Sequence, residues 1–270
     1  MQEWLVALVL GLVQGLLEWL PVSSEGTVAI VLSALGSPAD VATRYALFLH
    51  AGTAVAAAAF YREELRTLLA DVPAWRPRRA FGADLADLSF FGVATLVSGV
   101  VGVSGYVAIR EVASATAGGG FVAAIGALLV ATGLFMRVAE RRATEHREAP
   151  TLLDALLVGA LQGFAVLPGV SRSGTTVSAL LLRGYEGPTA LRLSFVLSIP
   201  AALGAGLLVV LDEGVGTLSL SGAALALATS AVVGYLAVGA LVGLVRRIAF
   251  WRVCVGFGAL AVVGGGLLLL

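Results

Sequence analysis

Long apolar stretches of this chain alternate with short polar ones, and the apolar stretches fall into two length classes. Six of them approach the roughly 20 residues that a helix needs to cross a bilayer. They run over residues 45–61, 89–109, 118–138, 193–211, 221–245 and 253–270. The pattern predicts one transmembrane helix for each stretch.

Two further apolar stretches, residues 3–36 and 151–184, are interrupted in the middle by polar sequence. The interruptions read PVSSEG, from Pro21 to Gly26, and PGVSRSGTT, from Pro168 to Thr176. The flanking halves, about 12–17 residues each, are too short to span comfortably. Proline ends the first half-helix, and serine or threonine can cap the second. Because irregular backbone at membrane depth must be buried in protein or line a wet cavity, the pattern predicts two re-entrant helical hairpins.

The two interrupted stretches also resemble each other. Gly11–Gly15 (GLVQG) matches Gly159–Gly163 (GALQG), and an LP pair follows each. The chain is therefore expected to be a single membrane domain, residues 1–270, made of one repeat over 1–140 and another over 150–270. Each repeat is a hairpin followed by three spans. Since a hairpin returns to its starting side and three spans cross over, the second repeat should be inverted. The expected fold class is an all-α integral membrane protein with six transmembrane helices and two re-entrant hairpins.

Composition supports a membrane location. The chain is 59% hydrophobic and 13% charged, against about 45–50% and 25% in soluble domains. A net charge of zero gives no basic field for nucleic acid. Trp4, Trp19 and Trp251 lie near ends of the expected segments and are expected at the membrane interface, among the surrounding lipids.

The basic residues, all of them arginine, are distributed unevenly between the two sides of the expected topology. Fourteen fall on one side and only Arg44 and Arg110 on the other. The positive-inside rule makes the arginine-rich side cytoplasmic. We therefore expect a multi-pass protein of the cell (plasma) membrane with both termini on the outer side.

Three ionisable residues, Glu18, Glu25 and Arg172, are the most deeply embedded in apolar sequence. Such a group at mid-bilayer costs at least about 2.5–3.5 kcal/mol on insertion scales, so its default interpretation is functional. The alternative is a buried ion pair that joins the two hairpins. Hydroxyl side chains gather at the same turns, which an ion pair alone does not require. They are Ser23, Ser24, Thr27, Ser171, Ser173, Thr175 and Thr176.

This set of residues suits a phosphate or diphosphate. Arginine offers a planar fork of donors that matches phosphate oxygens. A Ser/Thr/Gly turn that opens a helix presents backbone N–H groups to an anion, and Gly26 and Gly174 allow close backbone approach. A carboxylate beside an anion acts as a base or holds a cation. Glu18 therefore indicates either activation of a hydroxyl or water, or a bound Mg²⁺ or Ca²⁺ ion.

Two motifs in the hairpins resemble signatures of a known family. QGLLE, from Gln14 to Glu18, followed by LPVSS, resembles the first signature of the undecaprenyl-diphosphate phosphatases, the bacitracin-resistance family, and PGVSRSGTT resembles the second. The resemblance covers nearly the whole chain. It implies hydrolysis of a polyprenyl diphosphate lipid to the monophosphate and inorganic phosphate, which recycles the lipid carrier for cell-wall assembly.

The resemblance also implies roles for individual residues. Ser24 is expected to attack the terminal phosphorus, with Glu18 as base and Arg172 on the transferred phosphoryl group. A second route has Glu18 activate a water directly, with Ser24 only a ligand. The remaining residues are expected to bind substrate. They are Gln14, Ser23, Glu25, Thr27, Ser171, Ser173, Gly174, Thr175 and Thr176.

The chain departs from the family signature at Thr27, where the signature carries a histidine. The two histidines, His50 and His146, do not replace it by sequence position. His50 is interpreted as a helix-packing residue and His146 as part of a charged loop. The histidine-dependent step is then either dispensable or performed by Glu18 or Glu25.

Other functions fit parts of the pattern. Inverted repeats with broken helices at the midplane are also transporter architecture, so the alternative is a transporter or flippase for a phosphorylated lipid or a small anion. A purely structural membrane protein would not need the clustered hydroxyls. The sequence leaves the oligomeric state open, and a homodimer is one state that it allows.

Overall fold

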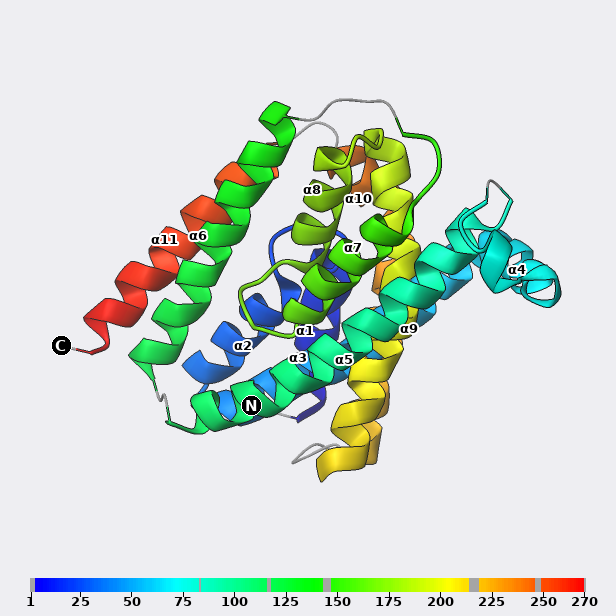
Figure 1. The fold of residues 1–270 in the computed structure, drawn as a ribbon. Coiled ribbons are helices and arrows are strands. Elements are labelled where there is room, and N and C mark those ends of the chain that lie inside the picture. The colour runs from blue at the N-terminus through cyan, green and yellow to red at the C-terminus, as the bar shows by residue number, and fades with distance from the viewer. Residues whose placement is uncertain are drawn as a thin grey trace.

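The computed structural model describes residues 3–82, 84–115, 118–142, 147–213, 219–245 and 249–269. Within these ranges the protein is all-helical (Figure 1). The α-helices are α1 Glu3–Leu17, α2 Ser24–Ala34, α3 Ala39–Phe60, α4 Arg62–Asp71, α5 Ala86–Ala115, α6 Gly119–Arg142, α7 Leu152–Phe164, α8 Arg172–Leu182, α9 Gly187–Glu213, α10 Leu220–Val245 and α11 Phe250–Leu267. Two short 3-10 turns, Val72–Ala74 and Pro77–Arg79, follow α4.

Five of these helices are long and apolar enough to cross a membrane, namely α5, α6, α9, α10 and α11. The protein is therefore a multi-pass membrane protein. Helix α3 has 22 residues, which is also a spanning length. It is more polar than the other five because it carries Asp40, Arg44 and His50.

The two interrupted stretches form two pairs of short helices, α1 with α2 and α7 with α8. Helices α2 and α8 have 11 residues each. At 1.5 Å per residue such a helix is about 16 Å long, roughly half the hydrocarbon core. Helices α1 and α7 end before Pro21 and Pro168, and the second helices start at the caps Ser23 and Ser171. The breaks thus lie where the sequence predicts them.

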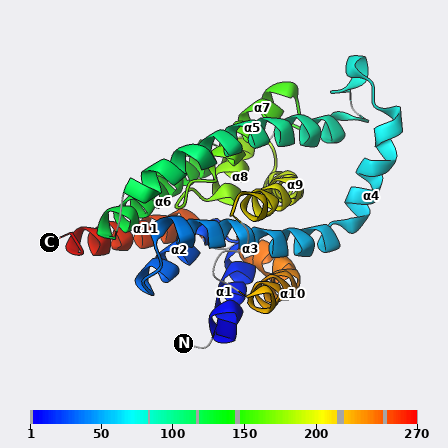
Figure 2. The same ribbon diagram turned by 90° about the horizontal axis from the view of Figure 1, so that it is seen from below.

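Helices of the first half pack on helices of the second. Helix α1 packs along α10, α5 along α7, α3 along α9 and α6 along α11, and the last pair lies side by side in both views (Figures 1 and 2). Glycines let these helices approach closely. A Cβ added at Gly126 of α6 would lie 2.5 Å from the carbonyl oxygen of Gly258 in α11.

Helices α3 and α9 run through the centre of the bundle, and the packing around them is uneven. Helix α10 lies closely along α3, whereas α5 contacts α9 much less. The space between α5 and α9 holds a cavity that reaches the polar centre of the protein.

Trp19 lies in the protein interior, so the prediction of an interfacial position was wrong for this residue. Its side chain is 1% exposed, its Nε1–H donates to the Gly234 carbonyl over 3.0 Å, and its ring meets Phe195 edge-to-face at 5.5 Å. The physical reason is that the turn after α1 packs against α9 and α10, which supply Phe195 and Gly234.

Candidate active site at the two hairpin turns

The turns of the two hairpins contact each other through one serine. The hydroxyl oxygen of Ser23 accepts from the backbone N–H of Gly26 over 3.2 Å and from that of Gly169 over 3.1 Å. Ser23 has φ 58°, a left-handed conformation that non-glycine residues rarely adopt. Gly169 has φ 100°, and a Cβ there would lie 2.4 Å from the carbonyl oxygen of Ile125. Such strain persists where the surroundings hold it, and it is common at functional sites.

Helices α2 and α8 both begin at this junction. Ser23 caps α2, and Ser171 caps α8 by accepting from the N–H of Gly174 over 3.1 Å. The first turn of a helix carries free N–H groups and the positive end of the helix dipole. Two such ends beside one another favour an anion at the junction.

The carboxylate of Glu18, just after α1, is the centre of a buried polar cluster. Its Oε2 accepts from the amide of Gln14 over 2.8 Å and from the hydroxyl of Ser24 over 2.7 Å, and its Oε1 accepts from Nη2 of Arg172. The side chain of Glu18 is 4% exposed and that of Arg172 10%. The ion pair between Glu18 and Arg172 joins the two hairpins. The same Glu18 carboxylate also contacts Ser24, the candidate nucleophile.

His50 of α3 belongs to this cluster, which the sequence analysis missed. Its Nε2 lies 2.9 Å from Oε1 of Glu25 and 3.1 Å from Oε2 of Glu18. Its Nδ1 bonds the carbonyl of Ala46 over 2.7 Å. The prediction that His50 serves helix packing accounts for Nδ1, which bonds within α3, but not for Nε2, which lies beside two carboxylates. The signal that could have found this residue was an ionisable side chain inside an apolar span, which is a functional-site candidate by default. His146 lies outside the described residues.

The serines and the threonines of the two turns do different things. Four serines line a cavity of about 10 Å³, the size of one water, together with Glu18, Glu25 and Arg172. They are Ser23, Ser24, Ser171 and Ser173.

The three threonine hydroxyls bond backbone carbonyls instead. Thr27 donates to the Ser23 carbonyl over 3.1 Å, and Thr175 to the Ser171 carbonyl over 2.9 Å. Thr176 donates to the Arg172 carbonyl over 2.8 Å and meets the Ser194 hydroxyl at 2.6 Å. In this arrangement the threonines fix the first turns of α2 and α8 and tie α8 to α9.

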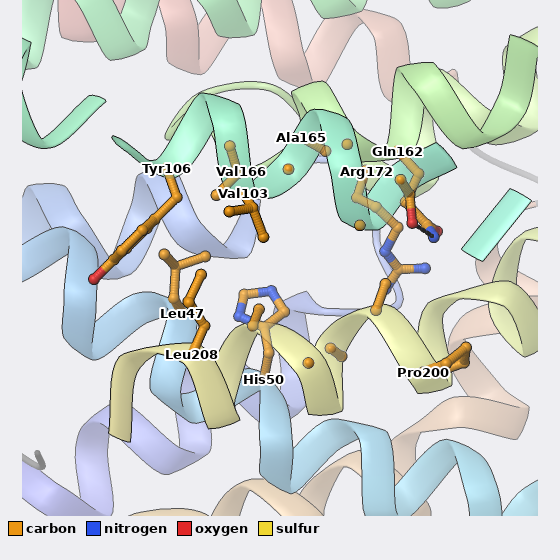
Figure 3. Close-up of a pocket in the computed structure, with 18 of the residues that line it drawn as sticks. Leu47, His50, Val103, Tyr106, Gln162, Ala165, Val166, Arg172, Pro200 and Leu208 are labelled. Carbon is orange, nitrogen blue, oxygen red and sulfur yellow. Dashed lines mark hydrogen bonds between the residues drawn. The ribbon is translucent and has the colours of Figure 1, made fainter. Parts of the chain in front are cut away.

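A cavity of about 420 Å³ reaches the cluster between α5 and α9. His50 and Arg172 point into the same space from opposite sides, and Leu47, Val103 and Leu208 line its apolar part (Figure 3). In the described part of the chain, Nη1 of Arg172 and Oε1 of Gln162 are buried without a hydrogen-bond partner. Both residues line this cavity, and buried polar atoms of this kind are ready for a ligand.

A second cavity, of about 460 Å³, reaches the cluster from the side of α6 and α11. Trp19, Ser173, Gly174 and Phe250 are among its lining residues. The first cavity therefore meets the cluster at Arg172, Glu25 and His50, and the second meets it at Ser173 and Gly174.

The donor set around Glu18 does not fit a resident Mg²⁺ or Ca²⁺ ion. These cations require several oxygen ligands with free lone pairs, whereas the Glu18 oxygens face a guanidinium, an amide, a hydroxyl and an imidazole. Over the described ranges, no group of three or more His, Cys, Asp or Glu side chains is arranged to hold a metal. We therefore derive no step through a cation held by Glu18.

Comparison with known proteins identifies the family. The family model for the bacitracin resistance protein BacA matches residues 7–263, which include the turns of both hairpins and the whole cluster. The chain belongs to the BacA family. An undecaprenyl-diphosphatase of Haloarcula marismortui is 55% identical over 266 residues, 98% of each chain. Proteins of the same name from Methanococcoides burtonii and Methanopyrus kandleri are 36% and 38% identical, over 95% and 97% of this chain and 96% of each relative. The BacA family match thus covers the helices that carry the site as well as the site itself.

Proposed function

We propose that this protein hydrolyses undecaprenyl diphosphate, or a similar polyprenyl diphosphate, to the monophosphate and inorganic phosphate. Membership of the BacA family and the names of its relatives support this activity. The single observation that carries it is the arrangement of Ser24, Glu18 and Arg172. A hydroxyl, a carboxylate base and a guanidinium lie in hydrogen-bond contact, and the guanidinium also lines a large apolar cavity.

In the proposed reaction Glu18 is the base and Ser24 the nucleophile. The Ser24 proton moves to Oε2 of Glu18 while Oγ bonds the terminal phosphorus. The bond between that phosphorus and the bridging oxygen breaks, and the lipid monophosphate leaves with the electron pair. Water then attacks the phosphoserine, and the Ser24 oxygen recovers a proton as phosphate leaves. In the alternative route no phosphoserine forms. Glu18 activates a water that attacks the terminal phosphorus directly, and Ser24 only binds the phosphoryl group.

Arg172 stabilises charge on the transferred phosphoryl group. Its Nη2 holds Glu18 and its Nη1 is free to donate to a phosphate oxygen. The guanidinium thus bridges base and substrate. The first turns of α2 and α8 add backbone N–H donors, and Ser23, Ser171 and Ser173 add hydroxyls. The residues Gln14, Glu25, Thr27, Gly174, Thr175 and Thr176 shape this pocket by holding Glu18, His50 and the two helix starts.

In this proposal the prenyl chain of the substrate occupies the apolar part of the cavity between α5 and α9. Side chains of α5 and α9, such as Val103 and Leu208, give this cavity an apolar wall. A diphosphate at Arg172 would then leave its lipid tail on that wall. Burial of this chain at about 0.8 kcal/mol per CH₂ would supply much of the binding energy.

We also propose the membrane topology: six spans, with α3 as the sixth, and two re-entrant hairpins in inverted repeats over residues 1–140 and 150–270. The fourteen-to-two distribution of arginines supports cytoplasmic loops at 62–88 and 139–150 and outward-facing termini.

Cysteine labelling tests this topology. Cys254 is buried, so a Cys254→Ala background is suited to labelling. Arg79→Cys and Glu148→Cys should react from the cytoplasmic side, and Ser219→Cys from the outer side. Labelling of Arg79→Cys and Glu148→Cys from opposite sides would contradict the topology.

The experiment that tests the activity measures phosphate release by purified protein from farnesyl diphosphate and from longer polyprenyl diphosphates. We expect release with both and a higher kcat/KM with the longer chain. Binding without release would instead support the transporter alternative. The mass of the protein in detergent, measured on the same sample, tests the homodimer.

A further inference from the structure

Two carboxylates of the cluster share one nitrogen atom. Nε2 of His50 lies 2.9 Å from Oε1 of Glu25 and 3.1 Å from Oε2 of Glu18. All three side chains are buried, with 5% exposure for Glu18 and His50 and 6% for Glu25. Two buried carboxylates this close to one another ordinarily share a proton, because their charges repel.

The hydrogen bonds around His50 indicate where protons lie. The Ala46 carbonyl can only accept, so Nδ1 carries a hydrogen and donates over 2.7 Å. A bare Nε2 would then place an unprotonated nitrogen within 3.1 Å of two carboxylate oxygens. The triangle of Glu18, His50 and Glu25 must therefore hold one more proton, on Nε2 or on a carboxyl group.

The partners of Glu18 favour a proton on the histidine. Glu18 accepts from the Gln14 amide, the Ser24 hydroxyl and the Arg172 guanidinium, and three donors stabilise an ionised carboxylate. The other charged groups that face His50 are Glu25 on α2 and Arg172 on α8. From α5 the cavity presents Tyr106, which bonds Asp212 of α9 over 3.1 Å on the other side of the cavity from Arg172.

We propose that His50 is a positioning residue that carries, as imidazolium, the proton that the two carboxylates would otherwise share. This keeps Glu18 ionised and able to accept the proton of Ser24. His50 neither gains nor loses a proton during turnover. It neutralises Glu25 beside the base, and so the base is available at neutral pH. The inference rests on the proposed function, because it assigns a role toward the base of that reaction.

The decisive experiment is a pH–rate profile for His50→Gln, Glu25→Gln and the double variant. Glutamine removes the positive charge but keeps a donor. In His50→Gln the two carboxylates hold a proton between them, so turnover at pH 7 should fall about 10- to 100-fold. The acid limb of the profile should move to higher pH by about one unit or more, and turnover should recover at high pH. His146→Gln, at the other histidine of the chain, is the matched control and should behave like wild type.

The double variant separates this role from a structural one. Removing Glu25 as well leaves a single carboxylate, so His50→Gln/Glu25→Gln should regain turnover at pH 7 that His50→Gln lost. A His50→Gln profile equal to wild type would overturn the inference. So would a loss that persists at every pH and that Glu25→Gln does not relieve, because that result would indicate direct substrate contact or a damaged fold.

A second measurement does not depend on activity. Infrared spectroscopy at pH 7 should detect a protonated carboxylic acid band in His50→Gln that is missing from wild type and from the double variant. If wild type releases no phosphate but this band appears in His50→Gln, the proposed function fails, whereas the assignment of the shared proton to His50 stands. If wild type is active but the band does not appear, the role of His50 fails and the function stands.

Discussion

The hydroxyl of Ser24 lies 2.7 Å from Oε2 of Glu18, although a turn with Pro21 separates the two residues in the chain. This is the distance at which a carboxylate can take the proton of a nucleophile. The contact forms because α1 stops at Leu17 and α2 starts at Ser24, so the chain reverses and brings the two side chains together.

Replacement of these two residues distinguishes the covalent route from the water route. If Ser24 is the nucleophile, Ser24→Ala should lower kcat by about 10³-fold or more, and Glu18→Gln should do the same. Phosphate release by purified, folded protein is the measurement, with Ser33→Ala near the other end of α2 as control. Substantial turnover in Ser24→Ala beside an inactive Glu18→Gln would exclude the phosphoserine and support the water route. Turnover in both variants would show that the site is elsewhere.

Arg172→Lys tests the bridge between the base and the substrate. Lysine keeps the charge but cannot hold Glu18 with one nitrogen and a phosphate oxygen with another. We expect kcat to fall about 10²-fold while the protein remains folded. Arg66→Lys is the control because that side chain is 71% exposed on α4. Near-normal turnover in Arg172→Lys would refute the role.

Gly169→Ala tests the contact between the hairpin turns. The positive φ and the nearby Ile125 carbonyl both oppose a Cβ at this position. The loss of stability should be about 1–3 kcal/mol from the backbone conformation alone, and activity should fall as well because Ser23 would lose its bond from the Gly169 N–H. Thermal unfolding in detergent measures the first effect. Gly92→Ala, where nothing lies within 4 Å of the added atom, should be neutral or slightly stabilising.

Leu208→Trp tests the position of the prenyl chain. A larger side chain in the apolar part of the cavity should hinder a long chain more than a short one. The ratio of kcat/KM for undecaprenyl diphosphate to that for farnesyl diphosphate should fall about tenfold. Leu236→Trp, at a side chain that is 74% exposed on α10, is the matched control. An unchanged ratio in Leu208→Trp would move the lipid out of this cavity.

Local signals in the sequence were sufficient for the breaks in the two hairpins, because proline ends one helix and a serine caps the next. The pairing of Glu18 with Ser24 was expected from the family resemblance. A buried ion pair between the hairpins was only the alternative at the sequence level, and the structure shows that Glu18 and Arg172 form one.

Features that depend on helix packing could not be derived in the same way. His50 reaches the cluster because α3 packs against α2, which carries Glu25. On another side Gly52 lets α3 approach α10 closely, since a Cβ there would lie 2.7 Å from the Leu227 carbonyl. No local pattern encodes that crossing.

Thr27 and Thr175 were expected to bind substrate, and in the structure they bond carbonyls of the preceding helical turn, as threonine often does at helix starts.

The ion pair between Glu18 and Arg172 joins positions 154 residues apart, and this separation matters while the chain is being made. At about 5–20 residues per second the ribosome adds Arg172 roughly 8–30 s after Glu18. During that interval the first hairpin carries two acidic side chains and has no guanidinium to pair with them. Of the two cationic side chains that contact these acids in the structure, His50 is synthesised much sooner than Arg172, so its imidazole is available to Glu18 and Glu25 first. The same histidine would then accompany these acids into the bilayer before the second hairpin exists.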